Sequence, residues 1–85
     1  MEEKAKQTFL ARAEQFIIWR RYKEALQELH GVLRIDPGDA DAMALIARVH
    51  LLRDEYDKAL HWAGTALQSD PNHRLAWFVR VCVFY

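Results

Sequence analysis

The chain has few of the residues that cross-link small folds through disulfides or metals. Its 85 residues include one cysteine, so no internal disulfide can form. The four histidines are His30, His50, His61 and His73. No pair of them has i, i+4 spacing, and none combines with Cys82 at a metal-ligand spacing. We therefore expect no bound metal, and a reducing compartment, with the cytoplasm as the predicted location.

A long apolar run and an excess of one charge are also absent. The most apolar stretch, Leu75 to Tyr85, contains Arg80 and is shorter than the roughly 20 residues that span a bilayer. The charged N-terminus does not resemble a secretory signal. Twelve basic residues balance twelve acidic ones, so no strong field would attract nucleic acid or an anionic membrane. The sequence predicts neither a nucleic-acid partner nor a membrane span.

Catalytic motifs are missing as well. The three glycines form no phosphate-binding loop, and no serine lies in a nucleophile elbow. Cys82 lies between Val81 and Val83 with no neighbouring base, which indicates a packing residue and not a nucleophile. We expect no catalytic residue and no cofactor, and predict that the protein is not an enzyme.

The two prolines are scarce but informative. They occur in Asp36-Pro37 and Asp70-Pro71, 34 residues apart. Proline cannot continue a helix, and it disfavours helical geometry in the residue before it. Each Asp-Pro therefore predicts a corner between two helices, and the fixed spacing indicates a structural repeat.

Other residues recur at the same offset. The identical pairs are Ala13 and Ala47, Tyr22 and Tyr56, Ala25 and Ala59, Leu26 and Leu60, and Leu33 and Leu67. This register resembles the tetratricopeptide repeat, whose pattern is W-x2-L-G-x2-Y, then A-x3-F, then P. The tryptophan position holds Phe9, Met43 and Trp77, and the turn glycine is replaced by Arg20 and Asp54.

The resemblance implies an all-α solenoid of antiparallel helix pairs in a single domain, residues 1–85. Repeat one would be residues 6–39, repeat two residues 40–73, and residues 74–85 a partial third repeat or a capping helix. We expect helices from about Lys4 to Trp19, from Tyr22 to Ile35, from Asp39 to Arg53, from Tyr56 or Asp57 to the second Asp-Pro, and from Asn72 or His73 to Tyr85.

In this family the first helices of successive repeats line a groove that binds peptides or helices. The groove positions predicted here are Leu10, Glu14, Ile17, Ala44, Leu45, Arg48, Leu51, Phe78, Val79, Cys82 and Tyr85, with Gln7, Ile18, Asp41, Leu52 and Leu75 beside them. The family's basic clamp for a C-terminal carboxylate has no counterpart, because the matching positions hold Leu10, Glu14, Leu45, Leu75 and Val79. The mostly apolar groove indicates an apolar peptide or helix as partner.

Two alternatives stay open for the function. The groove residues could be covered by a longer solenoid or by self-association. The chain could also be an accessory segment of a larger enzyme, or of a secretion or chaperone assembly, with the chemistry elsewhere.

The last predicted helix is apolar all round, which predicts burial on more than one side. If Trp77, Val81 and Phe84 pack on the preceding helix, then Phe78, Val79, Cys82 and Tyr85 point away from it. That arrangement predicts a homo-oligomer formed through the C-terminal helix.

Overall fold

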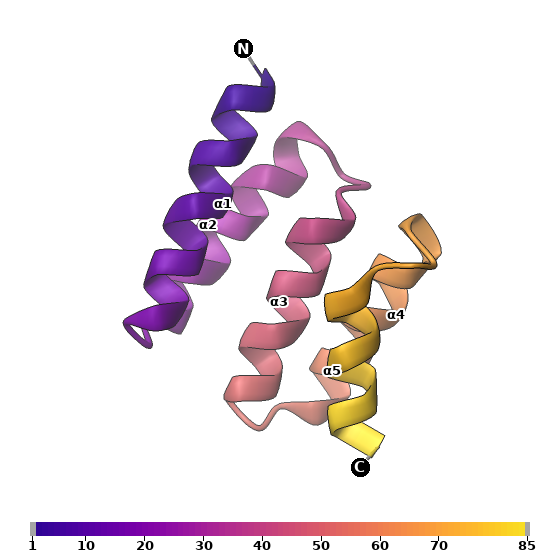
Figure 1. Ribbon diagram of the computed structural model, residues 1–85. Helices are drawn as coiled ribbons and strands as arrows, with labels where there is room; N and C mark the ends of the chain where they lie inside the picture. The colour runs from indigo at the N-terminus through magenta and orange to yellow at the C-terminus, as the bar shows by residue number, and fades with distance from the viewer. Residues whose placement is uncertain (1, 85) are drawn as a thin grey trace.

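The computed structural model describes residues 2–84, which form five helices and no strand (Figure 1). They are α1 (Glu2–Ile18), α2 (Tyr22–Ile35), α3 (Ala40–Leu52), α4 (Tyr56–Ser69) and α5 (Arg74–Phe84). The breaks fall at Arg20-Arg21, at Asp54-Glu55 and at the two Asp-Pro corners. The predicted all-α fold of antiparallel helix pairs is therefore confirmed.

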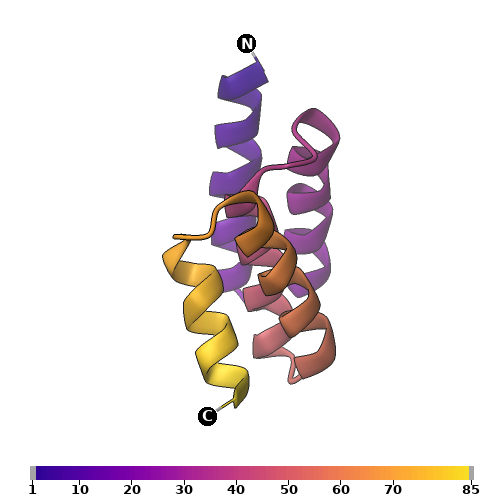
Figure 2. The ribbon, with the colours of Figure 1, turned by 90° about the vertical axis from the view of Figure 1, so that its right-hand side faces the viewer.

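The helices form two layers. α1, α3 and α5 lie in one layer, and α2 and α4 lie behind them (Figures 1 and 2). Each helix packs against the next in sequence, and α3 also contacts α5 and, over a smaller area, α1. The first helices of successive pairs are thus neighbours, so the surface of their layer is built from segments about 34 residues apart.

Within each pair, the turn has the same hydrogen bonds. Arg21 N–H donates to Phe16 C=O at 2.8 Å, and Glu55 N–H donates to His50 C=O at 2.8 Å. The residue before each of these donors, Arg20 or Asp54, has a positive φ of 62° or 61°. This is the Schellman motif, which ends a helix with one left-handed residue, usually glycine.

Between the pairs, an aspartate organises each corner. The Asp36 side chain accepts from Gly38 N–H at 3.2 Å, and the Asp70 side chain accepts from Asn72 N–H at 3.1 Å. Asp39 then caps α3 by accepting from Ala42 N–H at 2.9 Å. Lys6 of α1 contacts Asp39 at 2.7 Å and Asp36 at 3.2 Å, and these two hydrogen bonds raise the pKa of Lys6.

Small residues bring the helices of a pair close together. Ala13 and Ala25 of the first pair, and Ala47 and Ala59 of the second, are fully buried. Gly31 of α2 lies so close to α1 that an added Cβ would be 3.0 Å from the Phe9 ring. In α3, Met43, Ile46 and His50 are buried beside Ala47. The backbones of paired helices therefore approach each other closely, which is why alanine recurs at these positions.

The predicted orientation of α5 is wrong. Ala76 and Val79 are fully buried in the cluster shared with α3 and α4, with Val83 packed beside them. Trp77, Val81 and Phe84 are instead 45%, 51% and 64% exposed. These three residues lie on the side of α5 that corresponds to the side on which α1 packs against α2, and α3 against α4. No helix of the described residues follows α5 to cover this side.

Candidate protein-binding groove

The layer of first helices carries a pocket of about 170 Å³. Its walls come from three places in the chain: Leu10 and Glu14 of α1, Asp41 and Leu45 of α3, and His73 and Leu75 at the start of α5. Three of the predicted groove positions, Leu10, Glu14 and Leu45, thus meet in one hollow. The α3–α5 contact makes this possible, because it places the start of α5 beside α3.

A histidine–aspartate pair closes one side of the pocket. His73 Nε2 lies 2.6 Å from Asp41 Oδ1, and His73 Nδ1 accepts from Ala76 N–H at 3.4 Å. Because Nδ1 accepts, Nε2 carries the proton and donates it to the carboxylate. Leu10 and Leu75 are half-buried beside this pair. The pocket therefore combines an apolar lining with the carboxylates of Asp41 and Glu14.

The predicted groove positions divide into three groups. Glu14, Arg48, Phe78 and Cys82 are exposed, and Leu10 and Leu51 are half-buried. Ile17, Ala44 and Val79 were expected to face a partner, but they are 5%, 0% and 0% exposed, so they form the floor beneath the surface. Leu45 is also largely buried yet reaches the pocket wall. Tyr85 lies outside the described residues.

The exposure of Cys82 also corrects its predicted role. It was expected to be a packing residue, whereas its side chain lies at the surface of α5. The expectation failed because an apolar neighbour in sequence does not imply burial: Val81 is itself 51% exposed.

Two contributors to the surface were not predicted. His73 was weighed as a metal ligand and as a possible start of the last helix, but no role in the surface was predicted for it, although the 34-residue offset aligns it with Asp39, which caps α3. Trp19 is 60% exposed and stacks edge-on against Phe16 with ring centroids 6.1 Å apart. Its neighbour in sequence, Ile18, is also exposed, at the end of α1.

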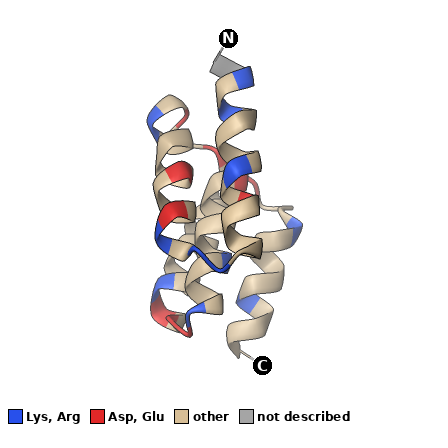
Figure 3. Cartoon of the chain, turned by 90° about the vertical axis from the view of Figure 1, so that its left-hand side faces the viewer, with Lys and Arg blue, Asp and Glu red and all other residues tan. Residues whose placement is uncertain are grey.

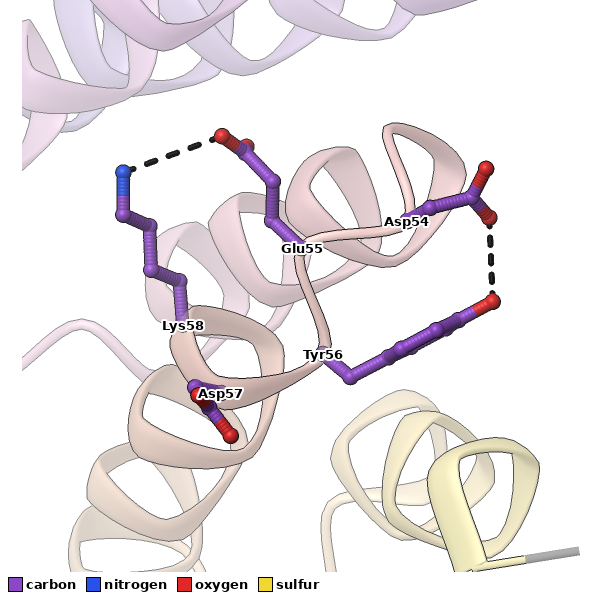
Figure 4. A pocket seen from close by; sticks show the side chains of 5 residues that line it. All are labelled: Asp54, Glu55, Tyr56, Asp57 and Lys58. Carbon is purple, nitrogen blue, oxygen red and sulfur yellow. Dashed lines mark hydrogen bonds and ion pairs between the residues drawn. The ribbon is translucent and has the colours of Figure 1, made fainter.

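A second pocket lies in the turn between α3 and α4 (Figure 4). It is lined by five consecutive residues, Asp54 to Lys58. Glu55 pairs with Lys58 at 3.7 Å and Tyr56 donates to Asp54 at 3.0 Å, as the figure shows. These side chains pair with one another across a single turn, so the hollow reflects local chain geometry.

His50 is the buried partner of this turn. Its side chain is buried in α3, and its Nδ1–H donates to Glu55 Oε1 at 2.8 Å. That hydrogen bond, with the nearby cations of Arg53 and Lys58, lowers the pKa of Glu55 below its ordinary value of 4.5. The contact fastens the start of α4 to the end of α3.

Charges of both signs are interspersed along the helices seen from the α1–α2 side (Figure 3). Among residues 2–84, no group of three histidine, cysteine, aspartate or glutamate side chains is arranged to hold a metal ion. Over the same residues, every helix is too short or too polar to cross a membrane.

Comparisons with known proteins agree with this architecture. A sequence model of the tetratricopeptide repeat family matches residues 20–78. Mouse "Tetratricopeptide repeat protein 33" is 36% identical over 58 residues, which are 68% of this chain and 22% of that protein. The chain thus spans about a fifth of the length of this curated relative.

The chain belongs to the tetratricopeptide repeat family. The match covers α2, α3 and α4 completely and reaches into α5. Repeats of this family serve as protein–protein interaction modules, which is the class of function that the fold defines.

Proposed function

We propose that the groove formed by α1, α3 and α5 binds an apolar segment of a protein partner. The observation that supports this most directly is the pocket that Leu10, Leu45 and Leu75 line from three different helices. A pocket of about 170 Å³ suits one apolar side chain, and the helices α1 and α5 that help to line it also carry the exposed apolar side chains Ile18 and Phe78.

The acidic groups at the pocket refine the proposed partner. Glu14 is exposed, and Asp41 accepts a hydrogen bond from His73. A basic group next to the apolar anchor would be attracted to these carboxylates, and an acidic tail would be repelled. The proposed ligand is therefore an apolar peptide or helix carrying a lysine or arginine near its anchor.

A peptide library displayed on phage tests this proposal. We expect the selected peptides to combine a large apolar residue with a basic one. Leu10→Glu should weaken their binding by about tenfold or more, because it removes an apolar wall of the pocket and the apolar anchor would have to desolvate the new charge. Gln27→Glu, on exposed α2 surface, is the matched control and should bind normally. Circular dichroism checks that both variants fold.

Glu14→Lys provides a second variant that keeps the packing intact, since Glu14 is exposed. It should shift the selection away from basic peptides. Selection of acidic C-terminal tails by the unmutated chain, or equal binding by the Leu10→Glu variant, would refute the proposal.

Self-association is a second candidate, favoured by the 60% exposure of Phe78 on α5. A two-fold dimer could bury Phe78 and Cys82 of both copies. Sedimentation at micromolar concentration would distinguish the two candidates: Phe78→Glu should convert a dimer to a monomer. We also propose that the chain consists of two full repeats and a partial third. A further candidate is a role as an accessory segment of a larger assembly.

A further inference from the structure

The turns within the two helix pairs lie at the same end of the molecule (Figure 1). We define the turn edge as residues 18–24, around the α1–α2 turn, and residues 52–58, around the α3–α4 turn. It is distinct from the groove pocket, which lies where α3 and α5 begin. Exposed large apolar side chains gather on it, namely Ile18, Trp19, Leu52 and Tyr56. Apolar side chains grouped in this way indicate a surface that binds another molecule.

The two turns carry opposite charges at four equivalent positions. The 34-residue offset aligns Arg20 with Asp54, Arg21 with Glu55, Lys23 with Asp57, and Glu24 with Lys58. Figure 3 shows the basic turn and the acidic turn from the α1–α2 side. The turn edge therefore has a mainly positive half at the α1–α2 turn and a mainly negative half at the α3–α4 turn.

The ion pairs of the turn edge stay within one turn. Arg21 pairs with Glu24 at 3.5 Å, and Glu55 pairs with Arg53 at 3.6 Å and with Lys58 at 3.7 Å. Among residues 2–84, no ion pair joins one turn to the other, and Lys23 and Asp57 take part in none. Charges on both halves are thus available to a partner.

The stability of the helices does not account for the positive half. The N-terminus of a helix favours acidic side chains, which explains Asp57 in the first turn of α4 but opposes Lys23 in the first turn of α2. Arg20 has a φ of 62°, a conformation in which glycine would be unstrained. A charged side chain held in such a conformation indicates a use beyond local structure.

We propose that the turn edge binds the same edge of a second copy of this chain. A two-fold axis that passes between the two turns, at right angles to the line joining them, places the positive half of each copy against the negative half of the other. The same rotation brings Ile18 and Trp19 of one copy toward Leu52 and Tyr56 of its partner. Each copy thus supplies both the charges and the apolar side chains that complement the other.

A second copy suits the turn edge better than a ligand of one charge. A purely acidic or purely basic ligand would be attracted to one half and repelled by the other. Further helix pairs in a longer solenoid would stack beside α5, because each repeat contacts only its neighbours, and would leave these helix ends uncovered. The interface does not include Phe78, so it is also distinct from self-association through α5.

The test is sedimentation velocity of the 85-residue chain at micromolar concentration in about 50 mM salt, where exposed charges are weakly screened. We expect a dimer. Lys23→Asp and Asp57→Lys should each weaken dimerisation about tenfold, because each variant places a like charge at both contacts of the symmetric pair. An equimolar mixture of the two variants should form a heterodimer about as tight as the original dimer, since opposite charges face each other again. Phe78→Glu, on α5, is the control and should leave the dimer intact.

Three results would overturn the proposal. The unmutated chain could stay monomeric at every concentration. Phe78→Glu could dissociate the dimer while Lys23→Asp does not, which would assign the interface to α5. The two charge variants could each be monomeric and remain so when mixed, which would show that the two halves do not pair. Circular dichroism checks that each variant folds; Lys23→Asp adds an acid to the first turn of α2, which favours the helix, so this variant decides the question even if Asp57→Lys unfolds.

Discussion

Replacing Arg20 by glycine should stabilise the protein, although it removes a charged side chain. Arg20 has a φ of 62° in the turn between α1 and α2, a conformation that costs an L-residue about 1–2 kcal/mol. Its side chain is exposed and forms no ion pair with any described residue, so little is lost with it. Its backbone N–H donates to Ile17 C=O at 3.0 Å, and glycine retains this bond.

The expected gain is smaller than the strain itself. Glycine loses about 0.5–1 kcal/mol more conformational freedom on folding than other residues, which offsets part of the relief. The net increase in the free energy of unfolding should be about 0.5–1 kcal/mol. For a domain of this size that corresponds to a rise of roughly 2–8 °C in the thermal midpoint.

The assay is thermal and urea unfolding followed by circular dichroism, with Arg20→Ala as the matched control. Alanine removes the same side chain but keeps the Cβ, so it should not share the gain. Asp54→Gly, at the equivalent turn, should gain less, because aspartate tolerates left-handed geometry better and Asp54 accepts a hydrogen bond from Tyr56. Equal stability of the Arg20→Gly and Arg20→Ala variants would refute the assignment of strain to this turn.

Two further predictions concern other residues. Gly64→Ala should stabilise α4 by about 0.5–1 kcal/mol, since an added Cβ meets nothing within 4 Å. Gly31→Ala should not show this gain, because its Cβ would press against the Phe9 ring. Equal gains for the two variants in urea unfolding would show that the contact between position 31 and Phe9 is absent. Because its pKa is lowered, Glu55 stabilises the fold at pH values above its ordinary pKa of 4.5, and this contribution should disappear as the pH falls through the lowered pKa. Glu55→Gln should flatten that part of the curve of stability against pH.

The sequence alone determined where the helices lie. Proline cannot continue a helix, so Asp36-Pro37 and Asp70-Pro71 marked the corners whatever the packing around them. The 34-residue register then placed Ala13, Ala25, Ala47 and Ala59 at the helix contacts, because only small side chains allow the backbones to approach so closely. The resemblance to the repeat family placed Leu10, Glu14 and Leu45 on one surface, and they line one pocket.

Only the tertiary structure decided which side of α5 is buried. The helix is apolar almost all round, so its periodicity singles out no face. In α1 and α3 the face bearing Phe9 or Met43 packs on the helix that follows, whereas the expectation for α5 placed Trp77 against the helix that precedes it. α5 does pack on helices that precede it, α3 and α4, but these are contacted by the small residues Ala76 and Val79. Trp77, Val81 and Phe84 are exposed because they lie on the side where the second helix packs in the other repeats.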